Sequence, residues 1–289
     1  MIILDGIAGL ATRYRGFVLD IWGVVHDGRA IFPGVVAALA ALRARGARIV
    51  FLTNAPRRAA VIEEQLAGFG VGRDLYDAVV SSGETTWALL RERAAPGAHP
   101  FVRDLGPRAT RIGPARDLLG LGELGFDAEA APDAADWVLN LGPDPALGAD
   151  SVAPYEPLLE RLLARDLPMI CVNPDRAVIA RGRRLICAGA LSEWYAARGG
   201  RTLEVGKPLP LAYAVALELL GLPLAEVVAI GDSPHTDLAG AAAVGLDAVW
   251  ALGGLAAEAG FDRAEPATLA AVAEREGVRP VAALRGLRW

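Results

Sequence analysis

Residues 17–23 read Phe-Val-Leu-Asp-Ile-Trp-Gly. A short apolar run that ends at an acidic residue is typical of a strand buried on both faces of a parallel sheet. The same kind of run recurs at 49–52 and at 227–230. Between the first two runs, residues 33–46 predict a helix that opens at a proline and stops at a glycine. These elements form a β-α-β unit, whose crossover we expect to be right-handed.

Polar residues follow each of these three strands. Asp20 follows the first, Thr53 and Asn54 follow the second, and Asp232 follows the third after one glycine. In an open parallel sheet, ligands bind outside the carboxyl ends of the strands. We therefore expect Asp20, Thr53 and Asp232 to converge in space, although they lie far apart in the sequence.

The middle of the chain differs from both ends. Residues 89–188 are interrupted by proline and glycine and contain strand candidates of their own at 137–140 and 169–172. About a hundred residues are enough for a separate small domain. We therefore predict an α/β fold with a Rossmann-like core on a parallel sheet, formed by residues 1–88 and 189–289, and an inserted α/β domain.

The composition argues against several classes of protein. A net charge of −5 and the lack of a long basic stripe disfavour a nucleic-acid surface. No apolar run approaches the ~20 residues that span a bilayer, and residues 1–15 lack the apolar region of a secretory signal. Cys171 and Cys187 make neither a disulfide framework nor a metal cluster, and they fit a reducing compartment. We expect a soluble, cytoplasmic protein that does not bind membranes.

Lys207 is the only lysine among 29 basic residues, and it lies between Gly206 and Pro208. A lysine ammonium differs from the guanidinium of arginine in reach, hydration and hydrogen-bond geometry. One interpretation is that Lys207 binds a phosphate as a point charge. The alternative is a lysine on a surface loop without a special function.

Four segments occur in an order that resembles the haloacid dehalogenase (HAD) superfamily of phosphohydrolases. The resemblance is to class IIA, the branch with a large α/β cap domain of the C2 type. The segments are Phe17–Gly23, Phe51–Pro56, Gly206–Pro208 and Gly231–Asp237. Residues 79–84 and 172–175 are also similar to this capped branch, so the resemblance extends over nearly the whole chain. It implies that residues 89–188 form the cap.

The resemblance implies a role for each acidic residue. Asp20 would attack phosphorus and form an acyl-phosphate intermediate, and Lys207 would neutralise charge during the transfer. Mg²⁺ would be held by Asp20, Asp232 and the backbone carbonyl of Trp22. Asp237 would be a further metal ligand or would orient one. Capping of a helix is the alternative role for Asp237.

Further polar residues would contact the phosphate of a substrate. Thr53 and Asn54 precede a predicted helix at 56–67, and helix N-termini bind phosphate. The alternative is that these two residues only cap the helix. Asn173 and Asp175 follow a predicted strand of the cap and would reach down to the substrate, unless they only form a turn.

Trp22 departs from the family pattern, in which a second aspartate two positions after the nucleophile acts as the acid/base. An indole nitrogen is only a hydrogen-bond donor. Loss of general acid/base assistance commonly costs ~10²–10⁴ in rate. Four residues are candidates for a substitute, namely His26, Asp27, Glu84 and His235.

Three functions are compatible with this departure. We favour a slow or specialised Mg²⁺-dependent phosphatase that acts on a small phosphorylated metabolite. The second is a hydrolase whose leaving group needs no acid, which includes non-phosphatase chemistry such as dehalogenation. The third is a sensor that binds a phosphorylated metabolite without hydrolysing it. In each case an exposed face of the cap could support a homodimer.

Overall fold

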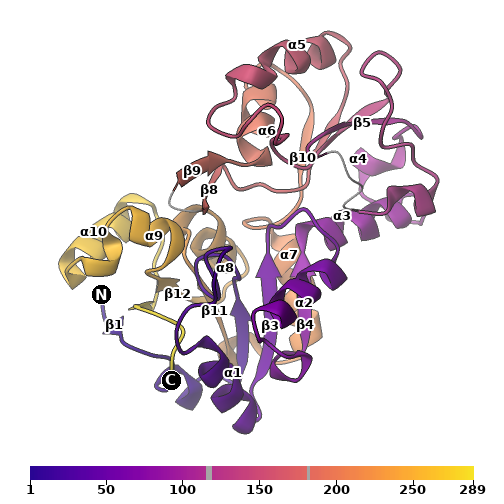
Figure 1. Cartoon of the computed structure of the whole chain (residues 1–289). Helices are drawn as coiled ribbons and strands as arrows, with labels where there is room; N and C mark the ends of the chain where they lie inside the picture. The colour runs from indigo at the N-terminus through magenta and orange to yellow at the C-terminus, as the bar shows by residue number, and fades with distance from the viewer. Residues whose placement is uncertain (115–118, 181–182) are drawn as a thin grey trace.

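The computed structural model describes residues 1–114, 119–180 and 183–289 of the chain. They form two domains, each built on its own parallel sheet (Figure 1). The larger domain, the core, contains both ends of the chain, and the smaller domain, the cap, is formed by the middle of the sequence. The predicted α/β fold with an inserted second domain is therefore confirmed.

Within the described residues, the core sheet has seven strands in the order β1-β13-β12-β11-β2-β3-β4, and all neighbouring strands are parallel. These strands are β1 (Ile3–Leu4), β2 (Gly16–Leu19), β3 (Arg48–Thr53), β4 (Ala78–Ser81), β11 (Val227–Gly231), β12 (Asp247–Ala251) and β13 (Ala282–Leu284). Phe17 of β2 pairs with Ile49 of β3 on one side and with Val228 of β11 on the other. The three predicted strands are therefore neighbours at the centre of the sheet.

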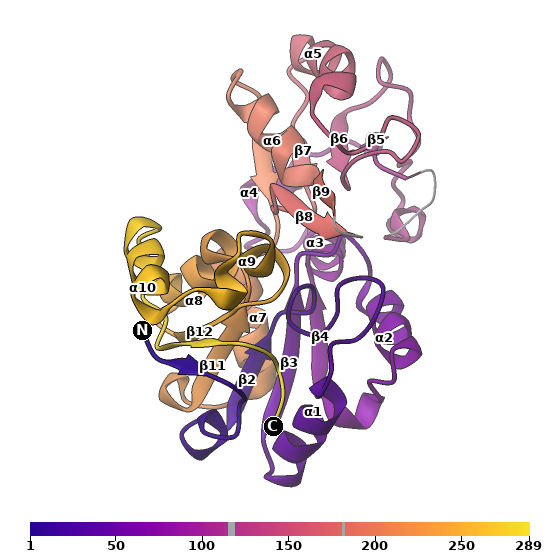
Figure 2. The same cartoon turned by 60° about the vertical axis from the view of Figure 1, so that its left-hand side comes forward.

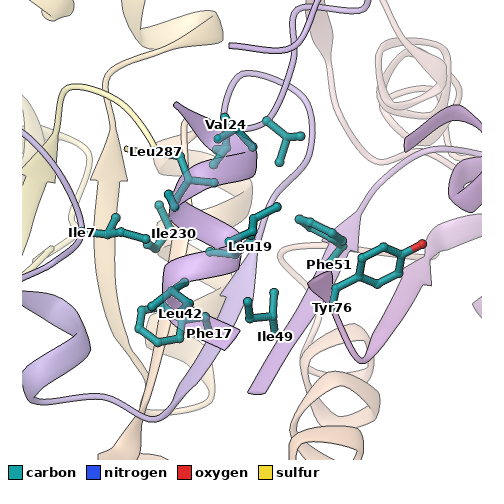
Figure 3. Close-up of a cluster of buried hydrophobic side chains, with 14 of the residues drawn as sticks. Ile7, Phe17, Leu19, Val24, Leu42, Ile49, Phe51, Tyr76, Ile230 and Leu287 are labelled. Carbon is teal, nitrogen blue, oxygen red and sulfur yellow. The ribbon is translucent and has the colours of Figure 1, made fainter. Parts of the chain in front are cut away.

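Alternate residues of the central strands pack on opposite faces of the core sheet. Phe17 and Leu19 lie in an apolar cluster with Leu42 of α1 (Figure 3), whereas Val18 lies in a second cluster with Tyr213 of α7. Because both faces are buried, the strands are apolar throughout and change to polar residues only where they end. The core helices are α1 (Val35–Ala44), α2 (Ala59–Gly68), α3 (Ser82–Arg91), α7 (Pro210–Leu220), α8 (Ala239–Ala243), α9 (Gly254–Glu258) and α10 (Pro266–Arg275).

Two core helices begin later than predicted. α1 begins at Val35 because Gly34, directly before it, has a positive φ of 88°. α2 begins at Ala59 and not at Pro56. The carboxylate of Glu84 accepts a hydrogen bond of 3.0 Å from the Ala59 N–H and so satisfies one of the free donors at the start of α2.

The cap has a four-stranded parallel sheet in the order β10-β7-β6-β5 and an antiparallel hairpin of β8 and β9, which we call the cap hairpin. Strands β6 and β7 confirm the two strands predicted in this region. The cap strands are β5 (Ala109–Ile112), β6 (Trp137–Asn140), β7 (Met169–Cys171), β8 (Ala177–Ala180), β9 (Arg183–Ile186) and β10 (Thr202–Glu204). The cap helices are α4 (Pro100–Arg103), α5 (Glu156–Ala164) and α6 (Ala188–Ala196).

The cap sheet continues beyond residue 188, where the sequence led us to end the insertion. β10 pairs with β7, with Leu203 opposite Ile170. Tyr195 of α6 is buried in the same apolar cluster as Leu159 of α5. Because α6 and β10 both pack within the cap, we propose that the cap runs to Val205.

The remaining elements are short. They are the 3-10 helices Leu10–Thr12, Arg73–Leu75, Leu121–Leu124, Ala153–Tyr155, Leu224–Glu226 and Phe261–Arg263 and the π-helical turn Pro234–Leu238. Across the described ranges, no helix is both long enough and apolar enough to cross a membrane. Cys171 and Cys187 are both buried with free thiols.

Candidate active site

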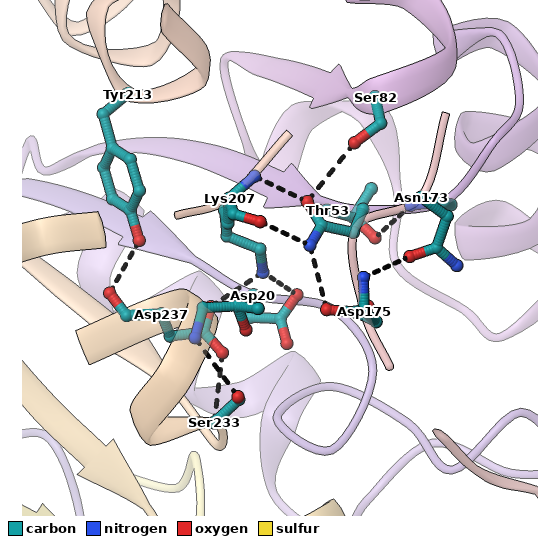
Figure 4. Close-up of polar contacts among 12 residues, drawn as sticks. Asp20, Thr53, Ser82, Asn173, Asp175, Lys207, Tyr213, Ser233 and Asp237 are labelled. Atoms are coloured by element: carbon teal, nitrogen blue, oxygen red, sulfur yellow. Dashed lines mark hydrogen bonds and ion pairs between the residues drawn. The ribbon is translucent and has the colours of Figure 1, made fainter. Parts of the chain in front are cut away.

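Polar side chains from three neighbouring strands meet at one edge of the core sheet. Asp20 directly follows β2, Thr53 is the last residue of β3, and Asp232 directly follows β11. All three side chains are buried. Figure 4 shows Asp20 and Thr53 together with Lys207 and Asp237 at this edge. The topology of the sheet thus brings these residues together, because the carboxyl ends of parallel strands point the same way.

Lys207 lies in the centre of this group. Its Nζ donates hydrogen bonds of 2.7 Å to Oδ1 of Asp20 and 2.7 Å to Oδ1 of Asp237. The residue is only 3% exposed, so the alternative of a lysine on a surface loop is wrong. Burial acts to lower the pKa of Lys207, but Asp20 and Asp237 outweigh it and hold the pKa well above its ordinary value. The ammonium group is therefore charged at neutral pH.

Asp20, Asp232 and Asp237 form a buried cluster in which one oxygen from each carboxylate lies within 4.8 Å of the others. Burial raises the pKa of Asp20 to about 7, although Lys207 acts in the opposite direction. Burial also raises the pKa of Asp232 well above its ordinary value, and Asp20 and Asp237 add to this effect. One lysine does not balance three carboxylates. A hard cation with a preference for oxygen ligands, such as Mg²⁺, therefore fits this cluster.

The carboxylates differ in which oxygens are already engaged. Both oxygens of Asp237 accept hydrogen bonds, Oδ1 from Lys207 and Oδ2 from the N–H of Ser233 at 3.1 Å. Asp20 uses Oδ1 for Lys207, and no donor among the described residues reaches its Oδ2. Asp232 accepts a backbone N–H at Oδ2, at 2.8 Å, and in the described part of the chain its Oδ1 has no donor. Asp20 and Asp232 thus each keep one oxygen free of donors from the described residues, whereas both oxygens of Asp237 are engaged, one of them by Lys207.

Two supporting contacts were not predicted from the sequence. The hydroxyl of Tyr213 donates a hydrogen bond of 2.7 Å to the backbone carbonyl of Asp237. The N–H that holds Asp232 belongs to Leu255, and Gly254 beside it lies so close that a Cβ there would be 1.9 Å from Asp232 Oδ2. The available signal was the glycine pair that follows β12, because glycine permits such a close approach.

The side-chain amide of Asn54 is fully engaged in hydrogen bonds. Oδ1 accepts from the N–H of Lys207 at 2.7 Å and from Oγ of Ser82 at 3.3 Å. Nδ2 donates to the carbonyl of Lys207 at 3.0 Å and to Oδ1 of Asp175 at 2.9 Å. An amide has two donor hydrogens, and both are used here. In place of the expected contact between the Asn54 side chain and phosphate, we therefore propose a positioning role.

The cap contributes Asp175 to the site, through its bond to Asn54. Asp175 lies in a buried environment, which raises the pKa of its carboxyl group. Oδ1 of Asn173 accepts a hydrogen bond of 3.1 Å from the N–H of Asp175, and this turn presents Asp175 to the core. Asn173 also lines a cavity of about 290 Å³ at the site, so its contact with a substrate stays a prediction.

Three cavities lie at the candidate site, and one of them, of about 350 Å³, is lined by Asp175, Asp232 and His235. A cavity of about 40 Å³ is lined by Asp20, Thr53 and Lys207, together with Trp22 and Asp175. A larger cavity of about 290 Å³ shares Trp22, Thr53 and Asp175 with it and extends between the core and the cap. The small cavity suits a phosphoryl group beside Asp20, and the cavity of about 290 Å³ suits the remainder of a substrate.

The four expected substitutes for the acid/base differ in where they lie. Asp27 and Glu84 line neither the 40 Å³ nor the 290 Å³ cavity, and His235 lines only the cavity of about 350 Å³. His26 lines the cavity of about 290 Å³, but its Nδ1 accepts the N–H of a nearby glycine at 2.9 Å, and burial lowers its pKa. Asp175, which we expected to bind substrate, is a carboxyl group that lines all three cavities. Trp22 itself donates its indole N–H to the cap, and the metal-binding role of its carbonyl stays a prediction.

Residues 17–116 match the family described as haloacid dehalogenase-like hydrolase, and residues 204–275 match a HAD-hydrolase-like family. A haloacid dehalogenase-like hydrolase from Brucella suis is 34% identical in its crystal structure, with 98% of this chain and 99% of that chain covered and a TM-score of 0.80.

Two curated relatives are similar over most of their length. Sugar-phosphatase AraL of Bacillus subtilis is 28% identical over 229 residues, which is 78% of each protein. Human glycerol-3-phosphate phosphatase is 28% identical over 254 residues, which is 82% of this chain and 78% of the human protein. With the two matched segments and the similarity to the Brucella protein over nearly its whole length, this chain belongs to the haloacid dehalogenase-like hydrolases.

Proposed function

We propose that this hydrolase is a Mg²⁺-dependent phosphatase that cleaves a small phosphorylated metabolite through a phospho-aspartyl intermediate on Asp20. The observation that carries the proposal is the buried pair of Asp20 and Lys207, whose atoms lie 2.7 Å apart beside a cavity of about 40 Å³. Lys207 is bonded to Oδ1 of Asp20, so one oxygen of the carboxylate is free of protein donors, and we propose that one oxygen of Asp20 attacks phosphorus while the other contacts the metal.

The reaction has two steps. In the first, one carboxylate oxygen of Asp20 forms a bond to phosphorus, the bond from phosphorus to the leaving oxygen breaks, and the alcohol or its anion departs. In the second, water attacks the same phosphorus, and phosphate and the Asp20 carboxylate are released. Lys207 stabilises the negative charge on the phosphoryl oxygens in both steps. Asp237 and Asn54 hold Lys207 in place.

The residues that would hold Mg²⁺ are Asp20, Asp232 and the backbone carbonyl of Trp22. The all-oxygen donor set and the excess of buried carboxylates over lysine support this assignment. The bound ion would supply Lewis-acid stabilisation and would screen the anionic nucleophile from the anionic substrate. Asp237 would not bind the ion itself; it would orient Lys207.

The relatives support a small phosphorylated metabolite as the substrate. One is named a sugar-phosphatase and another a glycerol-3-phosphate phosphatase. A cavity of about 290 Å³ between the core and the cap matches the size of a sugar or polyol unit. We therefore propose sugar and polyol phosphates as the first substrates to test.

The direct test is the release of inorganic phosphate from sugar phosphates, glycerol phosphate and 4-nitrophenyl phosphate, with and without Mg²⁺. We expect Mg²⁺-dependent turnover that is lost in Asp20→Asn, which is isosteric but a poor nucleophile. A wild-type protein that is stabilised by these ligands but releases no phosphate would contradict the proposal and would indicate a sensor. Unchanged turnover in Asp20→Asn would contradict the assignment of the nucleophile.

A further inference from the structure

Trp22 connects the nucleophile loop to the cap. Its Nε1–H donates a hydrogen bond of 2.8 Å to the backbone carbonyl of Ile179, which is 157 residues away in the sequence. Ile179 belongs to β8 of the cap hairpin. Figures 1 and 2 both show this hairpin at the boundary between the two domains, above the core sheet. The residue two positions after Asp20 is therefore bonded directly to the cap.

The indole ring of Trp22 is held in one orientation by the loop that follows it. The ring packs edge-on against His26, with 5.4 Å between ring centroids and an interplanar angle of 76°. Gly28 lies under the ring, where a Cβ would come within 2.1 Å of a ring carbon. Phe69 of the core packs against the other side of His26, with 4.8 Å between centroids. These contacts direct the indole N–H toward the cap.

Trp22 also lines two cavities of the site, those of about 40 Å³ and about 290 Å³. It lines the small cavity with Asp20 and Lys207, and it lines the larger cavity with Asp175 and Val178 of the cap. The larger cavity therefore has walls from both domains. Its size depends on where the cap hairpin sits relative to the core.

The hairpin also contacts the core through an ion pair, and the turn before it is bonded to Asn54 through Asp175. Arg184 of β9 lies 3.5 Å from Glu258 of α9, but both side chains are exposed. Exposed ion pairs contribute little, typically about 0–1 kcal/mol. The bond from Trp22 to Ile179 is partly buried and thus less subject to competition from water.

We infer that Trp22 is a positioning residue whose indole N–H holds the cap hairpin over the site and so sets the size of the cavity for the leaving group. The expected effect on KM rests on the proposed function. The expected effect on the position of the cap hairpin can be measured without a substrate. When the N–H is lost, a smaller fraction of the protein has the closed arrangement. The apparent affinity for substrate falls in proportion to the fraction of protein in the closed arrangement.

The test compares Trp22→Phe with Trp194→Phe. Phenylalanine at position 22 keeps an aromatic ring but lacks the N–H donor and the outer indole carbons that lie over Gly28, and Trp194→Phe makes the same truncation elsewhere. Trp194 is the matched control, because its Nε1 also makes a single hydrogen bond, of 3.2 Å, to Glu156 within the cap. For Trp22→Phe we expect hydrogen exchange in β8 and β9 to accelerate about 3- to 10-fold, and KM to rise by about the same factor. Trp194→Phe should change neither quantity.

Gly28→Ala provides a second route to the same displacement, because the new Cβ would meet the ring of Trp22. We expect the same faster exchange in the cap hairpin. Wild-type exchange in β8 and β9 of both Trp22→Phe and Gly28→Ala would overturn the inference, whatever the activity. Faster exchange in a protein without any phosphatase activity would overturn the proposed function and leave the positioning role standing.

Discussion

The Nζ of Lys207 lies 2.7 Å from Oδ1 of Asp20, and both side chains are buried. The same Nζ is bonded to Asp237, so a single ammonium group joins one carboxylate that directly follows β2 and one in the π-helical turn after β11. Removal of the ammonium would leave two buried carboxylates without their partner. The consequences for stability and for turnover can be measured separately.

We predict that Lys207→Met lowers kcat/KM by about 10²–10³, because the phosphoryl oxygens lose a charged donor in the transition state. The same change should destabilise the Mg²⁺-free protein by about 3–5 kcal/mol, since uncompensated buried charges remain. Phosphate release and urea unfolding test the two effects. Lys207→Arg keeps the charge but changes its shape. Restoration of full activity by arginine would contradict the need for a compact ammonium group.

We predict that Asp232→Asn makes the Mg²⁺-free protein more stable, by at least about 1 kcal/mol or ~2 °C in Tm. The change removes one of three carboxylates whose oxygens lie within 4.8 Å of one another. The new amide oxygen can still accept the N–H of Leu255. Wild-type protein should gain Tm on addition of Mg²⁺, and Asp232→Asn should gain much less. An equal gain in both proteins would place the metal elsewhere.

We predict that Asn54→Ala destabilises the protein by about 2–4 kcal/mol, because buried polar groups of Lys207 lose their partners. Urea unfolding measures this effect. Asn173→Ala is the comparison, because Asn173 makes a turn contact at the surface of the same site, and its loss should cost about 1 kcal/mol or less. Equal effects of both changes would contradict the central position assigned to Asn54.

We predict that Trp22→Asp turns over an alkyl phosphate at least about 10-fold faster than Trp22→Asn. Both variants lose the indole, and only the aspartate can donate a proton to the leaving oxygen. The difference should be much smaller for 4-nitrophenyl phosphate, whose phenolate departs without protonation. Steady-state rates on both substrates provide the measurement. Equal rates with the alkyl phosphate would indicate that another group, such as Asp175, already supplies the proton.

We predict that Glu84→Gln destabilises the protein at pH 7 by about 1 kcal/mol, allowing for the partial exposure of the carboxylate. Burial acts to raise the pKa of Glu84, but hydrogen bonds from Arg58 and Ala59 outweigh it and hold the pKa below its usual value of 4.5. A lowered folded-state pKa contributes stability above the unfolded pKa, and this contribution is lost as the pH falls through the folded value. Urea unfolding at pH 7 and in strong acid should therefore show a difference between variant and wild type only at pH 7.

The central strands and the chemistry at their ends could be predicted from local patterns. The run Phe17–Leu19 is apolar at every position because both faces of its strand are buried, and the polar residue Asp20 directly follows the end of the strand. The isolation of Lys207 in an arginine-rich chain pointed to its special role. Helix starts were less certain. Glu84, which satisfies the first N–H of α2, lies 25 residues beyond it and carries no local signal.

The sequence by itself determined the fold class, the family and the residues at the strand ends, because each depends on short patterns of apolar and polar residues. Only the tertiary structure decided which groups meet across the two domains. Asn54 bonds to Asp175 over 121 residues of chain, and Trp22 bonds to Ile179 over 157. The extent of the cap likewise depends on the pairing of β10 with β7. Such contacts depend on how separate elements pack in space, and hydrophobic periodicity along the chain does not specify them.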